Sequence, residues 1–281
     1  MGRQVGIGER GMRSLWLIGA ALLALVIWLP TLRWLLNEWW TNDYYSHGLL
    51  VPPISAFLAW RLWPGIRREP SNVGALLLGA SLAGYVAALA SNAYYLAGFA
   101  LIGMLAGAVW FMWGGQALRR LAFPIGFLIF MVPLPFIESQ TLPLALFTGK
   151  TSGQLIRALG VDVAVNGSQV SLPNADLVVG AQCSGVRSII ALFTLVSLAI
   201  FLLEGPGWGK ALMAVAAVPI AILGNVFRVA SLLLVANWWG AEAGFTYYHD
   251  YSGIVFFLTA FAALLGLSWV VRCREIRSDL W

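Results

Sequence analysis

The chain has 281 residues, of which 60% are hydrophobic and only 10% are charged, and its mean hydropathy is +0.82. This composition excludes a water-soluble globular protein and predicts a helical membrane bundle, because a backbone in hydrocarbon must satisfy its own hydrogen bonds. The net charge of +5 comes without a basic surface interleaved with aromatic residues, so nucleic acid is not an expected partner. We expect one transmembrane domain over residues 1–281.

Apolar stretches separated by polar breaks predict the membrane helices in chain order. The first has no clear small-residue cleavage site after it and is interpreted as a retained helix, not a signal peptide. The second is the weakest, because it is short and Pro52 and Pro53 lie in its first turn. The eight expected helices cover about 14–35, 48–63, 74–92, 95–113, 118–136, 186–204, 209–237 and 253–272.

The basic residues predict the orientation of these helices. They fall on one side of the membrane only if all eight helices cross, and the positive-inside rule then makes that side cytoplasmic. We therefore expect a multipass protein of the cytoplasmic (inner) membrane with both termini in the cytoplasm. The residues concerned are Arg61, Arg67, Arg68, Arg119, Arg120, Lys210, Arg272, Arg274 and Arg277.

The segment between the fifth and sixth helices is predicted to lie on the outer side. Leu142 to Leu159 is expected to form an interfacial amphipathic helix with Lys150 and Arg157 on its polar face, or else a re-entrant piece. Residues 161–172 then alternate apolar and polar around Asn166-Gly167, which predicts a β-hairpin. Asn166-Gly167-Ser168 also fits a glycosylation acceptor, but the turn is the preferred interpretation. The expected fold is thus all-α, with a short extracytoplasmic hairpin and an interfacial helix.

This hairpin leads to Cys183, one of only two cysteines. A small loop containing Ser184 and Gly185 connects the thiol to the start of a predicted membrane helix, where helix amides favour a thiolate. Cys273 is predicted a full bilayer away, so the two cysteines cannot form a disulfide. An unpaired cysteine in an oxidising compartment needs a reason, and nucleophilic catalysis is one.

A cation is expected at the same level as Cys183. Arg228 lies 18 residues beyond Lys210, about 27 Å along a helix, and charge within a membrane is costly and usually functional. Asn225, three residues earlier, shares its helical face and can orient the guanidinium or hydrogen-bond a substrate. A snorkelling arginine is the alternative.

Two histidines are candidate bases on the outer side. His249 comes just before the last helix, and His47 stands at the entrance of the second. Spacing alone cannot rank them, and each could instead be a hydrogen-bonding residue without a catalytic role. A thiolate, an imidazole and a guanidinium together can cleave an amide. Two histidines and one outer cysteine form no recognisable metal-ligand pattern, so neither a metal nor a cofactor is expected.

Four segments together resemble the exosortase/archaeosortase family. They are Tyr45 to Pro52, Ala181 to Ser188, Gly224 to Arg228, and His249 before the final helix. The resemblance spans about residues 43–260, and the ordered set is specific although each piece alone is weak.

This resemblance implies a multipass cysteine peptidase, or transpeptidase, with Cys183 as the nucleophile, His249 as the acid/base and Arg228 as the transition-state stabiliser. The expected substrates are secreted proteins that end in a short motif, a hydrophobic helix and a basic tail. The product would be released to water or transferred to a lipid or other surface acceptor. The supporting residues expected around this site are Asn225, His47, Ser184 and Gly185.

Two other functions are compatible with the residues. A transporter or assembly factor could use Arg228 and Asn225 to bind an anionic substrate while Cys183 merely packs. A thiol-dependent acyltransferase would share the thioester and differ in its donor. The absence of a nucleotide-binding loop argues against nucleotide-driven transport.

Overall fold

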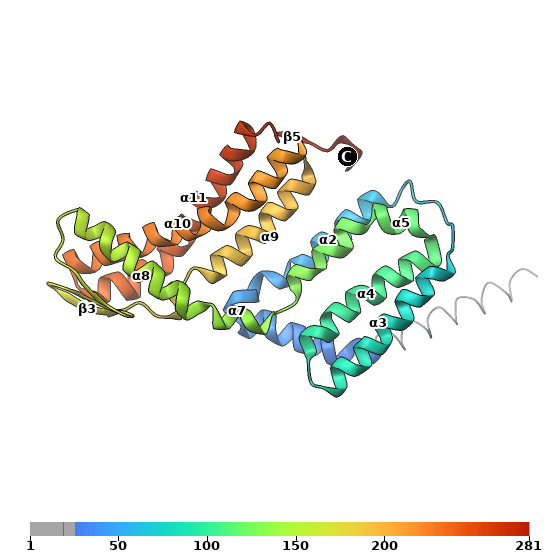
Figure 1. Ribbon diagram of the computed structural model, residues 1–281, viewed down its shortest axis with the longest axis horizontal. Coiled ribbons are helices and arrows are strands. Elements are labelled where there is room, and N and C mark those ends of the chain that lie inside the picture. Colours follow the sequence, from blue (N-terminus) through green and yellow to red (C-terminus); the bar gives the residue numbers. More distant parts are fainter. Residues whose placement is uncertain (1–18, 20–25, 281) are drawn as a thin grey trace, which may run out of the picture. The chain divides into compact units, whose positions relative to one another are not determined.

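The computed structural model describes residue 19 and residues 26–280, except for the side chains of residues 245–247, 249, 250 and 279. Contacts divide the chain into two units. The first comprises residues 1–42, 48–53 and 65–133, and the second comprises residues 43–47, 54–64 and 134–281. Figure 1 traces the chain through both.

The first unit is a helical assembly centred on an antiparallel helix pair. A helix over residues 26–41 precedes it, and the pair itself is α3 (Asn72–Ala90) and α4 (Tyr94–Trp113). The pair packs closely because Gly74 and Gly107 lack side chains where the partner backbone passes. The buried Tyr85 hydroxyl donates to the carbonyl of Ile27 at 2.7 Å, which ties α3 to the preceding helix.

The predicted helix 118–136 is not continuous, which corrects the sequence expectation. The chain instead forms α5 (Gly115–Arg120), α6 (Ala122–Phe127) and the 3₁₀ turn η2 (Leu128–Met131). Pro124 explains the break at Leu121, because proline has no N–H for a helical bond to Arg120 and its ring would meet that carbonyl. The residue is tolerated within the first turn of α6.

The second unit contains the remaining elements, and its core is a set of three long helices. These helices, α9, α10 and α11, run side by side in Figure 1. The helices of this unit are α2 (Val51–Leu62, its first three residues in the other unit), α7 (Pro135–Ser139), α8 (Thr141–Ala158), α9 (Val186–Leu202), α10 (Gly207–Trp239) and α11 (His249–Val270). Short 3₁₀ turns are η1 (Asp43–Leu49), η3 (Ala181–Cys183) and η5 (Ser278–Leu280), and a π-helical turn, η4, covers Ala243–Tyr248.

Helix α8 confirms the helix expected over 142–159. Its buried face consists, apart from Ile156, of small and hydroxyl residues, among them Thr148, Ser152 and Gly153. The Ser152 hydroxyl donates to the carbonyl of Val226 at 2.9 Å, so α8 is fastened to the middle of α10. Whether α8 lies at the interface or re-enters the membrane stays a prediction.

The predicted hairpin is confirmed and is part of a larger sheet. Strands β1 (Ala164–Asn166) and β2 (Gln169–Leu172) pair antiparallel around Gly167, whose φ is 61°. A third strand, β3 (Ala175–Val178), adds to β2 and was not expected. A second sheet joins β4 (Leu203–Glu204) to β5 (Glu275–Ile276) beyond the far end of α9.

The described residues contain five helices long and apolar enough to span a membrane, or six if the bent helical pair 122–131 and 135–158 counts as one span. The protein is therefore a mainly helical, multipass membrane protein with small sheets. The expected count of eight crossings is not confirmed, since α2 has only 12 residues and most of 14–25 lies outside the described residues.

Candidate functional site

The Cys183 loop turns the chain from β3 into α9. Cys183 ends the 3₁₀ turn η3, with its N–H bonded to the carbonyl of Gly180 at 2.9 Å. The Ser184 hydroxyl accepts a bond from the N–H of Val186 at 3.3 Å and so satisfies one amide of the first helical turn. The thiol thus precedes the helix by three residues, as the sequence predicted for the start of α9.

Gly185 completes the loop and leaves room for α10. Its φ of 77° lies in the left-handed region, which side chains other than glycine rarely adopt. A Cβ at this position would lie 2.6 Å from the Cγ atom of Asn225. Both the backbone angle and the close approach therefore require glycine.

Asn225 fixes the Cys183 loop from α10. Its side chain is 4% exposed, and its Nδ2 donates to the carbonyl of Cys183 at 2.7 Å and to the hydroxyl of Thr148 at 3.3 Å. One buried amide thereby joins α8, α10 and the loop. The sequence placed Arg228 at the level of Cys183, and Asn225, one turn before Arg228, contacts the Cys183 loop directly.

Arg228 lies one turn further along α10 and is half-buried. Its Nε donates to the Ser252 hydroxyl at 3.3 Å, and its guanidinium lies beside Gly253, where an added Cβ would be 3.6 Å away. The guanidinium is thus oriented by α11 rather than simply extended toward solvent.

A small hollow, partly open and with room for about one water molecule, lies among α9, α10 and α11. Asn225 and Arg228 line it together with Ser188, and apolar residues line the remainder. Cys183 is not among the lining residues. Asn225 therefore connects the two, since it lines the hollow and bonds the Cys183 carbonyl.

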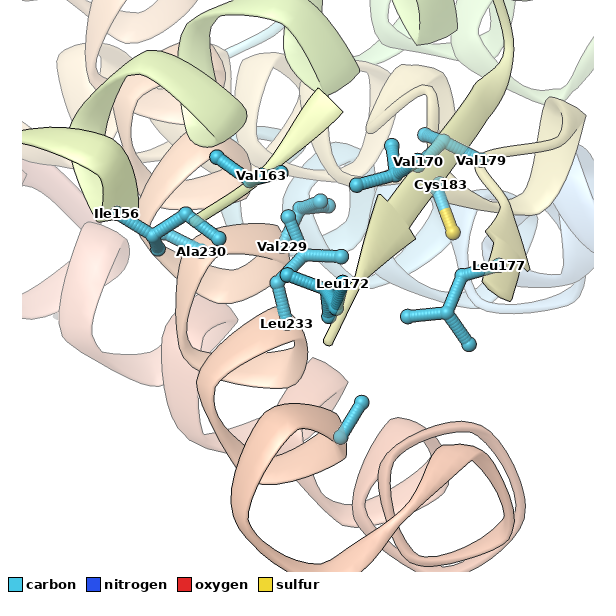
Figure 2. Close-up of a cluster of buried hydrophobic side chains, with 11 residues drawn as sticks. Ile156, Val163, Val170, Leu172, Leu177, Val179, Cys183, Val229, Ala230 and Leu233 are labelled. Atoms are coloured by element: carbon cyan, nitrogen blue, oxygen red, sulfur yellow. The ribbon is translucent and has the colours of Figure 1, made fainter. Parts of the chain in front are cut away.

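The Cys183 side chain is only 1% exposed and belongs to a buried apolar cluster. Figure 2 shows its sulfur pointing toward Leu177 of β3, and Leu172 of β2 belongs to the same cluster. The three-stranded sheet thus covers the thiol. The sequence placed Cys183 next to a hairpin but gave no sign that the strands enclose it.

The two candidate histidines have different outcomes. His249 is the first residue of α11, three residues before Ser252, but its side chain lies outside the described side chains. His47 lies in η1 and stacks on Tyr45, with ring centroids 6.0 Å apart. This stacking does not join His47 to Cys183, and the catalytic role of His47 stays a prediction.

Arg187 and Thr148 are contact residues that the sequence analysis did not single out. Arg187, the second residue of α9, lies 3.8 Å from the Asp43 carboxylate and donates to the Ser46 hydroxyl at 3.4 Å. These contacts bring η1 to the start of α9. The charge of Arg187 at the start of an apolar helix could have indicated its role from the sequence. Nothing in the sequence distinguished Thr148 from other hydroxyl residues.

Cys273 lies at the other end of the second unit, as expected. It is fully buried beside Gly205 and Gly209, where β4 leads into α10. The length of α9 separates this position from Cys183, and both thiols are free. Among the residues that the structure describes, no group of three or more His, Cys, Asp or Glu side chains could hold a metal ion.

Comparison with known proteins identifies one family. The family model of transmembrane exosortases (Exosortase_EpsH) matches residues 39–266, which is more than half of the chain. No curated protein and no solved structure matches. The matched region contains the Cys183 loop, the Asn225 and Arg228 face of α10, and the start of α11. The chain therefore belongs to the transmembrane exosortase family.

Proposed function

We propose that the protein is a membrane-embedded cysteine peptidase or transpeptidase that cleaves the C-terminal sorting signals of secreted proteins. The observation that carries the proposal is the bond from Asn225 to the Cys183 carbonyl, which joins the loop of a free thiol to the face of α10 that carries Arg228. Membership of the exosortase family supports it, because that family generally comprises cysteine peptidases and transpeptidases.

In the proposed reaction, the Cys183 thiolate attacks the carbonyl carbon of the scissile peptide bond. Arg228 stabilises the negative oxygen of the tetrahedral intermediate. The C–N bond then breaks, the leaving amine takes a proton from His249, and a thioester remains on Cys183. Water or the amine of a lipid or other surface acceptor attacks the thioester and gives a proton to His249, and the C–S bond breaks to release the Cys183 thiolate.

The burial of Cys183 requires that the site opens for the substrate. The cover consists of β2 and β3, whose inward side chains Leu172 and Leu177 belong to the same cluster as the thiol. A sheet of three short strands has few backbone bonds to break, so we infer that its displacement admits the substrate.

We also propose the inner membrane as the location, with the Cys183 loop on the extracytoplasmic side and both termini in the cytoplasm. The second unit supports this orientation, because Lys210, Arg272, Arg274 and Arg277 gather near β4 and β5, at the end opposite Cys183. A substrate tail helix could then cross the membrane with its basic end inside and its cleavage motif level with Cys183.

Intact-mass analysis of a tagged candidate substrate tests the proposal. Wild type and Cys273→Ala should remove its C-terminal tail, whereas Cys183→Ala should not, and added acceptor mass at the cut would identify a transpeptidase. Tail removal by Cys183→Ala would refute a thiol nucleophile.

The other functions make different predictions for the same variants. A transporter that binds an anionic group through Arg228 and Asn225 should lose function in Arg228→Ala but keep it in Cys183→Ser. An acyltransferase should label Cys183 with a lipid probe in preference to a peptide probe.

A further inference from the structure

Asn225 has one polar atom that the fold does not use. Its Nδ2 atom donates two hydrogen bonds, one to the Cys183 carbonyl and one to the Thr148 hydroxyl. Its Oδ1 atom is buried and accepts no hydrogen bond from the described residues. Leaving a buried carbonyl oxygen without a donor costs about 1–3 kcal/mol. Such an atom in an otherwise well-bonded site indicates a missing partner.

The orientation of the amide is determined by its neighbours. The Cys183 carbonyl can only accept a hydrogen bond, so the nitrogen of Asn225 must face it. The oxygen is therefore the acceptor that remains, and rotation of the amide would replace a good bond with repulsion between two oxygens.

The position of this acceptor limits what its partner can be. Asn225 lines the hollow together with Arg228, and it also holds the loop of the nucleophile. A substrate strand bound at the nucleophile loop therefore also lies next to Asn225. The partner must be a hydrogen-bond donor, and every non-proline peptide unit carries one in its N–H.

We propose that Asn225 Oδ1 binds a backbone N–H of the substrate, close to the scissile bond. The inference rests on the proposed peptidase function and deepens it. Nδ2 holds the nucleophile loop while Oδ1 holds the substrate strand, so a single side chain aligns both reactants. Recognition through the backbone needs no particular side chain at that substrate position, except that proline is excluded because it lacks the N–H.

The test uses peptides that span the mapped cut site, each with one backbone amide other than the scissile one replaced by an ester. An ester removes a single N–H and leaves the side chains intact. With the full-length wild-type protein in detergent, one ester peptide should lose about tenfold in kcat/KM, a typical effect of one hydrogen bond.

Three variants assign that loss to Asn225. Asn225→Asp keeps an acceptor oxygen and should keep the tenfold ester effect, although its overall rate falls because the bond to the Cys183 carbonyl is gone. Asn225→Leu has a similar shape and no acceptor, so amide and ester peptides should react equally. Asn237→Ala is the matched control, because it removes a second asparagine of α10 twelve residues away and should behave as wild type.

Each outcome decides between the alternatives. Equal rates for the all-amide peptide and every ester peptide would overturn the role of Asn225 while leaving the peptidase function intact. An ester effect that persists in Asn225→Leu would assign the N–H to another group and also overturn it. If even the all-amide peptide is not cleaved, the peptidase proposal itself fails and this inference fails with it.

Discussion

At the scale of single residues, the site depends on the lack of a side chain at Gly185 as much as on the side chains of Cys183, Asn225 and Arg228. Gly185 allows both the left-handed turn before α9 and the approach of Asn225. The precise placement of the thiol therefore depends on a residue with no side chain.

Gly185→Ala should disable processing and lower stability. The methyl group strains a left-handed backbone, which costs about 1–3 kcal/mol, and it displaces the Asn225 side chain from the Cys183 carbonyl. Thermal unfolding in detergent and the substrate mass assay measure the two effects. Gly180→Ala is the matched control, because a Cβ there meets no atom within 4 Å and its φ is −85°. Equal behaviour of the two variants would contradict this account.

At the scale of elements, the three-stranded sheet acts as a cover for the nucleophile. Adjacent residues of β3 face opposite ways, since Leu177 is 6% exposed while Val178 is 57% exposed. Only Leu177 belongs to the cluster around the thiol. The alternation of a strand thus provides a test and its control in neighbouring positions.

Leu177→Ala should speed the reaction of Cys183 with a small maleimide by about tenfold or more. Removing a buried leucine side chain costs about 2–5 kcal/mol, and about 1.4 kcal/mol corresponds to a factor of ten. The maleimide reaction is quenched at set times in a Cys273→Ala background, and intact-mass analysis then gives the rate of Cys183 labelling. Val178→Ala should label at the parental rate. A leucine variant that labels no faster than the parent would mean that the sheet does not control access.

Sequence patterns predicted the elements better than their contacts. Apolar length found α3, α4, α9, α10 and α11, and Asn166-Gly167 found the first hairpin. The strand β3 was not predicted, because a strand of four residues between two loops shows little periodicity. The break at Leu121 was foreseeable from Pro124, whereas the bond from Asn225 to Cys183 joins residues 42 apart and depends on how α8, α9 and α10 pack.

At the scale of the whole molecule, the number of crossings depends on α2. Its 12 residues span only about 18 Å, but the seven residues of η1 precede it and add about 14 Å at the 3₁₀ rise. Together they match the roughly 30 Å of a hydrocarbon core. Contacts within the second unit support a crossing by η1 and α2. At one end of this unit, η1 contacts Arg187 at the start of α9. At the other end, Arg61 of α2 donates to the carbonyl of Leu280.

We therefore expect η1 and α2 to cross the membrane as one element, which would place residues 41 and 67 on opposite sides. In a chain with Cys183→Ala and Cys273→Ala, single cysteines are introduced as Thr41→Cys, Arg67→Cys, Ser168→Cys and Arg274→Cys. A membrane-impermeant maleimide should label the first and third variants in spheroplasts, and the other two only after the membrane is permeabilised. If Thr41→Cys and Arg67→Cys label from the same side, then α2 does not cross.

The same variants test whether the segment 118–136 spans the membrane despite its broken helix. The number of expected crossings between Arg67 and Arg274 is even, so Arg67→Cys and Arg274→Cys should label from the same side. Labelling from opposite sides would mean that the segment 118–136 does not cross.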